Sequence, residues 1–143
     1  MIYFDTSYIL KCYLNEPGCE KVRDLAQNSK GLCSSILAKA EFYSGLCRHY
    51  EEKRIKKYHF EILQKLFLDD TKNRIWTWLP LDEFIISKVL EIYRTFKTEK
   101  LRSADAIHIA TAIISGAGEI YSNDLRMLKS ADAIGLTGVN VLN

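Results

Sequence analysis

Four acidic residues stand where the predicted fold could bring their carboxylates to one place. They are Asp5, Glu41, Asp105 and Asp124. Two carboxylates about 5 Å apart repel each other by about 3 kcal/mol when the effective dielectric constant is about 20. A cluster of four therefore needs a divalent cation, or else it takes up protons. If this cluster forms, its chemistry is that of a metal-dependent enzyme.

Helix capping is the competing explanation for three of the four. Asp5, Asp105 and Asp124 lie at or near predicted helix starts, where a carboxylate accepts hydrogen bonds from free backbone N–H groups and complements the helix dipole. Taken singly, each is better explained as a cap. Asp5 and Asp124 also follow predicted strands, however, and open parallel sheets bind ligands at the carboxyl ends of their strands. The shared position favours one site over three separate caps.

Glu41 lies well inside its predicted helix, so capping does not account for it. Ser44 and Gly45 leave the neighbouring helix surface open, at a cost in helix propensity. Two interpretations stay open. The side chain either faces solvent near Lys39 and Arg48, or it points toward a cation.

Polar neighbours could hold the carboxylates, or waters bound to a metal, by hydrogen bonds. They are Ser7, Ser122 and Asn123. Local hydrogen bonding at helix starts explains these three at least as well. His108 lies one turn after Asp105, but Mg²⁺ prefers oxygen ligands, and a histidine on an apolar helix is typically a core residue. We therefore leave His108 out of the predicted metal ligands.

The elements that must position these residues alternate strand-like runs with helical patterns, which predicts an α/β fold with a parallel sheet covered by helices. The predicted strands are residues 1–4, 31–34, 75–79, 119–121 and 138–142. The predicted helices are residues 6–14, 20–28, 36–49, 51–68, 82–97, 103–115 and 124–131. Residues 128–134 nearly duplicate residues 101–107, but one short match is no repeat architecture. Asp132 is therefore expected at a helix end, outside the acidic cluster.

The totals favour one domain over residues 1–143, because the chain has 143 residues and is 48% hydrophobic. A net charge of +2 does not by itself indicate a nucleic-acid binder. The four cysteines form no C-x-x-C pair and have no histidine at zinc-ligand spacing. We find no signal-peptide pattern and no apolar run long enough to span a bilayer, so a cytoplasmic protein with no membrane contact and reduced thiols is expected.

Four segments, in this order, resemble the PIN domain and, within it, the VapC-type toxins of toxin–antitoxin pairs. Residues 1–11 resemble the first strand and helix of that family, and residues 35–42 resemble its glutamate helix. Residues 103–112 and 120–125 resemble its third and fourth acidic motifs. The resemblance implies a three-layer α/β/α sandwich with a five-stranded parallel sheet and the four carboxylates at its carboxyl edge.

The resemblance also implies an activity, a cofactor and partners. The activity is that of an endoribonuclease toxin that cleaves RNA with Mg²⁺ or Mn²⁺ held by Asp5, Glu41, Asp105 and Asp124. The partners are a second copy of the chain and a small antitoxin that blocks the acidic pocket. Many relatives carry a further acidic residue two positions after the fourth, where this chain has Arg126. We therefore expect a single tightly held ion.

An acidic pocket repels phosphate, so basic residues beside it must hold the RNA. The basic run that leads up to Asp105 is expected to do so: Arg94, Lys97, Lys100 and Arg102. A denser basic run over residues 53–57 is typical of the solvated face of an amphipathic helix. Tyr8 and Tyr13 could stack on bases, but packing in the core or in a dimer explains them better.

Two other classes of function compete with the nuclease. One is a non-catalytic PIN-like module that binds RNA or protein; the intact acidic set argues against it, because such a scaffold has no reason to keep carboxylates that repel one another. The other is a phosphoryl-transfer protein. Haloacid-dehalogenase-like phosphatases need a second aspartate where Ser7 stands, receiver domains need an acidic neighbour for Asp5, and the P-loop motif is absent.

Overall fold

The computed structural model has a five-stranded sheet in the order β3-β2-β1-β4-β5, with every neighbouring pair parallel, so the first strand is the central one. The strands are β1 (Ile2–Phe4), β2 (Leu32–Ser35), β3 (Trp76–Leu79), β4 (Glu119–Tyr121) and β5 (Thr137–Val139). Parallel strands are covered on both faces, which matches their short and largely apolar sequences. The structure describes residues 1–98 and 100–142.

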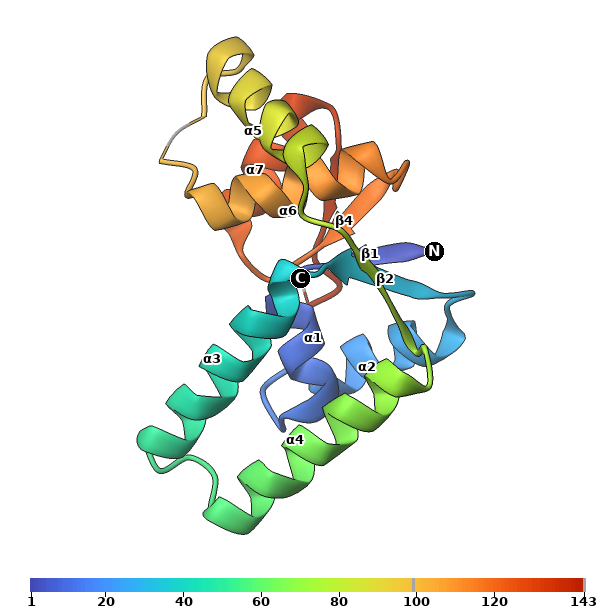
Figure 1. The fold of residues 1–143 in the computed structure, drawn as a ribbon, viewed down its shortest axis with the longest axis vertical. Coiled ribbons are helices and arrows are strands. Elements are labelled where there is room, and N and C mark those ends of the chain that lie inside the picture. The colour runs from blue at the N-terminus through green and yellow to red at the C-terminus, as the bar shows by residue number, and fades with distance from the viewer. Residues whose placement is uncertain (99, 143) are drawn as a thin grey trace.

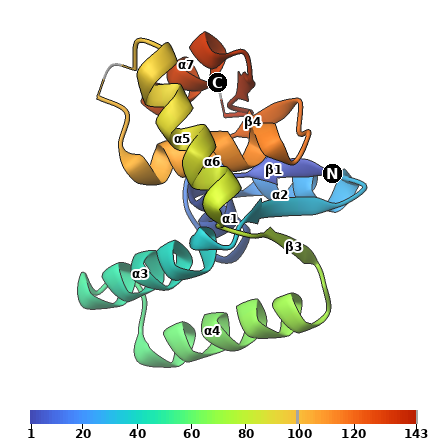
Figure 2. The same ribbon diagram turned by 45° about the horizontal axis from the view of Figure 1, so that its top comes forward.

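Seven helices are formed by the described residues. They are α1 (Thr6–Tyr13), α2 (Cys19–Asn28), α3 (Leu37–Glu51), α4 (Lys57–Lys72), α5 (Glu83–Thr95), α6 (Ser103–Ile114) and α7 (Leu125–Ile134). Helices α1 to α4 lie on one side of the sheet and α5 to α7 on the other (Figures 1 and 2). The predicted α/β/α sandwich with a five-stranded parallel sheet is therefore confirmed.

The hydrophobic core has two parts, one on each face of the sheet. Adjacent residues of β1 point to opposite faces, as the alternation of a strand requires. Tyr3 packs with Ile92 and Ile109 on the side of α5 to α7, whereas Phe4 packs with Phe42 on the side of α1 to α4. All five side chains are fully buried. The central strand thus anchors both halves of the molecule around the residue that follows it, Asp5.

The predicted helix over residues 51–68 is wrong at both ends. Helix α3 continues to Glu51, the chain turns through residues 52–56, and α4 begins at Lys57 and continues to Lys72. Lys53 adopts a left-handed backbone conformation in this turn, with φ of 60°. Residues other than glycine seldom adopt this conformation, so the sequence gives no sign that the chain reverses direction here.

Only part of the apolar surface of α4 faces the core. Tyr58, Ile62 and Leu66 are 64%, 51% and 47% exposed, whereas Leu63 and Phe67 are buried. The apolar residues of α4 therefore form two neighbouring stripes, and only one of them packs on the protein.

The structure also decides the predictions for two tyrosines, for the cysteines and for the ends of α5 and β5. Tyr8 is fully buried and Tyr13 packs against the core, so core packing is the correct explanation for both. The cysteines are free thiols. Helix α5 and strand β5 end earlier than predicted, at Thr95 and Val139. In the described part of the chain, no helix is long and apolar enough to span a membrane.

Candidate functional site

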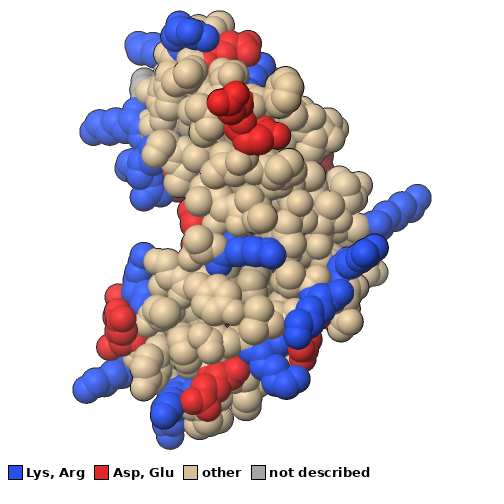
Figure 3. All heavy atoms as spheres, in the orientation of Figure 1, with Lys and Arg blue, Asp and Glu red and all other residues tan. Residues whose placement is uncertain are grey.

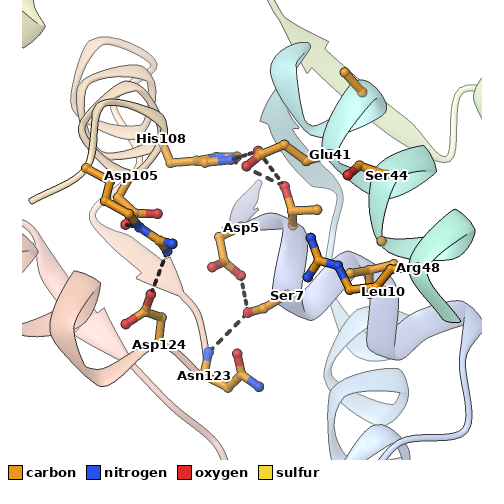
Figure 4. A pocket seen from close by; sticks show the side chains of 14 residues that line it. Asp5, Ser7, Leu10, Glu41, Ser44, Arg48, Asp105, His108, Asn123 and Asp124 are labelled. Atoms are coloured by element: carbon orange, nitrogen blue, oxygen red, sulfur yellow. Dashed lines mark hydrogen bonds and ion pairs between the residues drawn. The ribbon is translucent and has the colours of Figure 1, made fainter. Parts of the chain in front are cut away.

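The carboxyl ends of β1 and β4 open into a cavity of about 550 Å³ that all four predicted acidic residues line. Asp5 follows β1, Glu41 comes from α3, Asp105 from the first turn of α6, and Asp124 directly precedes α7. Their side chains surround one space in Figure 4. At the left edge of Figure 3 the surface is hollowed, with acidic atoms at the hollow and basic side chains above and below it.

Asp5 is the buried member of the set, with an exposed fraction of 6%. Its Oδ1 accepts hydrogen bonds from Ser7 Oγ at 2.6 Å and from the backbone N–H of Tyr8 at 3.1 Å, and its Oδ2 accepts one from Ser122 Oγ at 2.6 Å. Burial raises the pKa of Asp5 above its ordinary value of 3.8, although the nearby His108 and these hydrogen bonds act in the opposite direction. Asp5 thus caps α1 and faces the cavity at once.

Two serines join the loops that follow β1 and β4. Ser122 Oγ, which donates to Asp5, accepts the backbone N–H of Asp124 at 2.9 Å. Ser7 Oγ accepts the backbone N–H of Asn123 at 3.2 Å. All three residues predicted to support the carboxylates therefore take part in one hydrogen-bond network, Asn123 through its backbone (Figure 4).

Glu41 points into the cavity, where its Oε1 accepts a hydrogen bond from Thr6 Oγ1 at 2.8 Å and lies 2.6 Å from His108 Nε2. Burial opposes its ionisation, but His108 and Thr6, with the charge of Arg102, outweigh this effect and lower the pKa of Glu41. Lys39, which could have lain beside a solvent-facing Glu41, lies over the ring of Trp78. Of the two open interpretations, the structure supports the one in which Glu41 faces the site.

His108 is the residue that the sequence analysis missed. It is 2% exposed, and its Nδ1 lies 2.8 Å from the hydroxyl of Tyr3, which accepts the backbone N–H of Ser35 at 3.0 Å. Because Glu41 is ionised, His108 Nε2 must carry a hydrogen and donate it to Glu41. In a neutral imidazole protonated at Nε2, Nδ1 then accepts the hydrogen of the Tyr3 hydroxyl. The only sequence signal was its position one helical turn after Asp105, on the same face.

Arg102 was predicted to face RNA, and the structure places its guanidinium between two of the carboxylates. Its Nε lies 3.2 Å from Asp105 Oδ2 and its Nη2 lies 3.6 Å from Asp124 Oδ2. The hydrogen bond and the charge of Asp105 raise the pKa of Arg102. The other oxygen of Asp124 caps α7 by accepting two backbone N–H groups, from Arg126 and Met127. Asp124, like Asp5, caps a helix and lines the cavity.

The other predicted basic residues lie outside this cavity. Lys97 and Lys100 line a neighbouring hollow, and Arg94 is exposed in the last turn of α5. The basic run over residues 53–57 is exposed around the turn between α3 and α4, as expected of a solvated surface. Asp132 accepts the backbone N–H of Gly138 at 2.8 Å and is not part of the acidic set.

The donor set of the cavity fits a hard cation. Mg²⁺ and Mn²⁺ favour carboxylate oxygens, and Mg²⁺ usually keeps several waters while bound by one or two carboxylates. Within residues 1–98 and 100–142, no three acidic, histidine or cysteine side chains lie close enough to ligate one ion directly. Arg102 now supplies the positive charge between Asp105 and Asp124, so an ion held by both would have to displace it.

Comparison with known proteins places this geometry in a family. The PIN domain model matches residues 2–133. FitAcB from Neisseria gonorrhoeae is 20% identical with a TM-score of 0.73, over 98% of this chain and 97% of that one. VapBC2 from Rickettsia felis, bound to a DNA fragment from its promoter, is 19% identical with a TM-score of 0.68, over 98% of each chain. A toxin–antitoxin complex from Klebsiella pneumoniae is 18% identical with a TM-score of 0.60, over 87% of each chain.

No curated protein sequence matches the chain. Likeness to solved structures at these identities shows the fold, and the family model covers nearly the whole sequence. The all-parallel sheet, the cavity at its carboxyl edge and the match over residues 2–133 agree with one another. This chain therefore belongs to the PIN domain family.

Proposed function

We propose that this protein is an endoribonuclease toxin of a toxin–antitoxin pair, which hydrolyses RNA with the help of Mg²⁺ or Mn²⁺. The observation that carries the proposal is the meeting of Asp5, Glu41, Asp105 and Asp124, from four separate segments, in one cavity of a PIN domain. PIN domains are generally nucleases. A carboxylate-lined cavity without a nucleophilic triad suits hydrolysis by water rather than by a protein nucleophile.

A bound Mg²⁺ or Mn²⁺ would supply an activated water and positive charge near the attacked phosphate. The four carboxylates would hold it directly or through water. Ser7 and Ser122 orient the two oxygens of Asp5, and Thr6 and His108 fix Glu41. Arg102, whose side chain is 73% exposed, is free to contact a substrate phosphate once it leaves Asp105 and Asp124.

The proposal includes partners as well as a substrate. The similar structures named above include toxin–antitoxin complexes, and a small antitoxin and a homodimer are proposed here by analogy. The exposed stripe of Tyr58, Ile62 and Leu66 on α4 supports a protein partner, because contiguous exposed apolar surface often marks an interaction site. A single PIN domain over residues 1–143, acting in the cytoplasm, completes the proposal.

A non-catalytic binding module is the second candidate, and one observation favours it. The sequence argument against it was that a scaffold has no reason to keep carboxylates that repel one another. Arg102 neutralises Asp105 and Asp124, and His108 donates to Glu41, so the metal-free site relieves much of that repulsion by itself. The two candidates are separated by the effect of metal on RNA.

The deciding experiment is cleavage of a mixed structured RNA pool by the purified chain in Mn²⁺, in Mg²⁺ and in EDTA. Asp5→Asn and Asp105→Asn are expected to abolish discrete cutting. Asp132→Asn is a matched control, because Asp132 occupies the same local sequence as Asp105 but lies outside the cavity. The control is expected to cut as the wild type does.

Each other outcome has a definite meaning. Equal cutting by all four proteins points to a contaminant or to a site elsewhere, and the proposal fails. RNA bound equally with metal and with EDTA, without any cutting, establishes the binding module instead.

A further inference from the structure

A basic hollow of about 620 Å³ lies between α7 and the loop that joins α5 to α6. Its charged lining residues are Lys97, Lys100, Arg126 and Lys129. No carboxylate lines it among the described residues, and the remaining lining residues are small or apolar. In Figure 3, Lys and Arg side chains gather at the upper left, where Figure 1 has this loop.

The basic hollow is linked to the acidic cavity by a third hollow that adjoins both. This third hollow, of about 540 Å³, shares Arg102, Asn123 and Asp124 with the acidic cavity. It shares Leu125 and Arg126 with the basic hollow. The three hollows follow one another along the surface, acidic at one end and basic at the other. We call the hollow lined by Lys97, Lys100, Arg126 and Lys129 the basic trough.

The cations of the basic trough lie near one another, and none has an acidic partner among residues 1–98 and 100–142. Arg126 and Lys129 are exposed, and neither they nor Lys97 and Lys100 form an ion pair within the part of the chain that the structure describes. Arg102, by contrast, is engaged with Asp105 and Asp124. Several like charges along one groove raise the local potential and attract an anionic ligand.

We infer that the basic trough binds the phosphates of the RNA strand that flanks the scissile bond, as a single strand. This inference rests on the proposed nuclease function and adds a substrate subsite to it. The acidic cavity repels phosphate, so the binding free energy must come from cations that the strand reaches next. Arg126 is the first of these beyond Asp124, and Lys129 follows one turn later on α7.

The trough also offers apolar contact to bases or riboses. Leu125 is 63% exposed and lines both the third hollow and the basic hollow. Grooves that bind single strands combine cations along the backbone with surfaces against which bases pack. An acidic protein segment would suit the cations equally, but the position of the trough next to the proposed catalytic cavity favours the substrate itself.

The test is binding of a short labelled single-stranded RNA, followed by fluorescence anisotropy in EDTA over a series of KCl concentrations. The variant is Arg126→Gln with Lys129→Gln. Each phosphate contact contributes about 0.7 to the slope of log affinity against log salt, so the slope should fall by about 1.4. Affinity at low salt should fall by about 30-fold or more, because two charge-assisted contacts to phosphate are lost.

The matched control is Lys56→Gln with Lys57→Gln, which removes two exposed cations near the start of α4. It is expected to leave both slope and affinity near the wild-type values. All the substituted side chains are exposed, so equal melting temperatures are expected and exclude unfolding as the cause.

The outcomes separate this inference from the proposed function. If the α7 variant binds RNA as the control does, the inference is wrong even when the wild type cuts RNA with Mn²⁺. If binding falls as expected and no protein cuts RNA in any ion, the subsite stands and the nuclease proposal fails. If RNA binding is unchanged while binding of poly-glutamate falls, the trough takes an acidic protein segment and the inference is overturned.

Discussion

Asp5 is the one buried carboxylate of the four, and Glu41 is half-buried. Burial raises the pKa of Asp5, whereas hydrogen bonds from His108 and Thr6 and the charge of Arg102 leave the pKa of Glu41 lowered. The two neighbours therefore respond to pH in opposite senses. A native state whose acid has a raised pKa binds its proton more tightly than the unfolded chain does, and a lowered pKa has the reverse effect.

This contrast predicts opposite pH dependences for two variants in EDTA. Protonation of Asp5 stabilises the folded state fully below the ordinary pKa of 3.8, and this stabilisation is lost as pH rises through the raised pKa. Asp5→Asn should therefore gain stability relative to the wild type as pH rises. Ionised Glu41 stabilises the folded state fully above its ordinary pKa of 4.5, and this stabilisation is lost as pH falls through the lowered pKa. Glu41→Gln should therefore be less stable than the wild type only at the higher pH. Urea unfolding over a pH series measures both. Parallel curves for the two variants would contradict the assignment.

Tyr3 and Tyr8 provide a matched test of how Glu41 is held. Each is fully buried, and each hydroxyl accepts one backbone N–H and bonds one side chain. Tyr3→Phe and Tyr8→Phe should therefore each cost about 1–3 kcal/mol of unfolding free energy. Only Tyr3 reaches Glu41, through His108, so only Tyr3→Phe should also lower RNA cleavage, by about 10- to 100-fold.

Denaturant unfolding and cleavage rates measured at saturating Mn²⁺ check this pair. His108→Gln keeps an N–H donor at the position of Nε2 and should retain more activity than His108→Ala. Equal cleavage by the two Tyr→Phe variants would mean that the contact from Tyr3 to His108 does not position Glu41.

At the residue scale, the sequence identified the acidic side chains and the serines that hold Asp5, but not the groups that hold Glu41. Asp5 and Asp124 were identifiable because each follows a strand and begins a helix, which fixes both position and direction. The partnership of His108 with Glu41 spans 67 residues of sequence, and no local pattern specifies it. Arg102 was assigned to RNA because it belongs to a basic run. Its ion pair with Asp124 depends on folding, which brings α6 and the loop after β4 together.

At the scale of the elements, Gly138 in β5 packs directly against the backbone of α7. A Cβ atom added to Gly138 would meet Leu128 at its Cβ, its carbonyl oxygen and its Cα, at 2.9, 2.9 and 3.0 Å. Backbone atoms cannot move aside as the end of a side chain can, so Gly138→Ala should push α7 off the sheet and cost about 1–3 kcal/mol. Asp124 caps α7, so RNA cleavage should fall as well.

Gly118, just before β4, is the matched position for this prediction. A Cβ there meets nothing within 4 Å. Gly118→Ala should therefore be neutral or stabilise the protein by up to about 1 kcal/mol. Thermal unfolding of both variants measures the difference, and a Gly138→Ala protein as stable as Gly118→Ala would mean that α7 and β5 are not so closely packed.

Helices α3 and α4 show what an element's sequence can and cannot predict. Apolar periodicity correctly indicated helix over most of both segments, because it depends only on neighbours along the chain. The turn between them relies on the left-handed conformation of Lys53, and the choice of Phe67 over Leu66 as the buried residue depends on Phe42, which stacks on Phe67 with ring centroids 4.0 Å apart. Neither is visible from α4 alone.

For the whole molecule, strand order was the feature that sequence composition did not reveal. Alternating strand-like and helical patterns predicted a parallel sheet of five strands, and the family resemblance implied the same number. The observed order puts β1 between β2 and β4, so residues from both ends of the chain meet beside Asp5. The oxygen of Ser122 that donates to Asp5 is 117 residues away in sequence. Only this topology explains why four separated acidic motifs form one cavity.

The central place of β1 also has a consequence for synthesis. On the ribosome, Asp5 emerges 117 residues before its hydrogen-bond partner Ser122, and Asp124 follows Ser122. A nascent chain that carries Asp5 and Glu41 therefore lacks part of the cavity lining until the loop after β4 has been synthesised. The hydrogen-bond network around Asp5 cannot be complete before that loop is made, so the proposed activity cannot begin earlier.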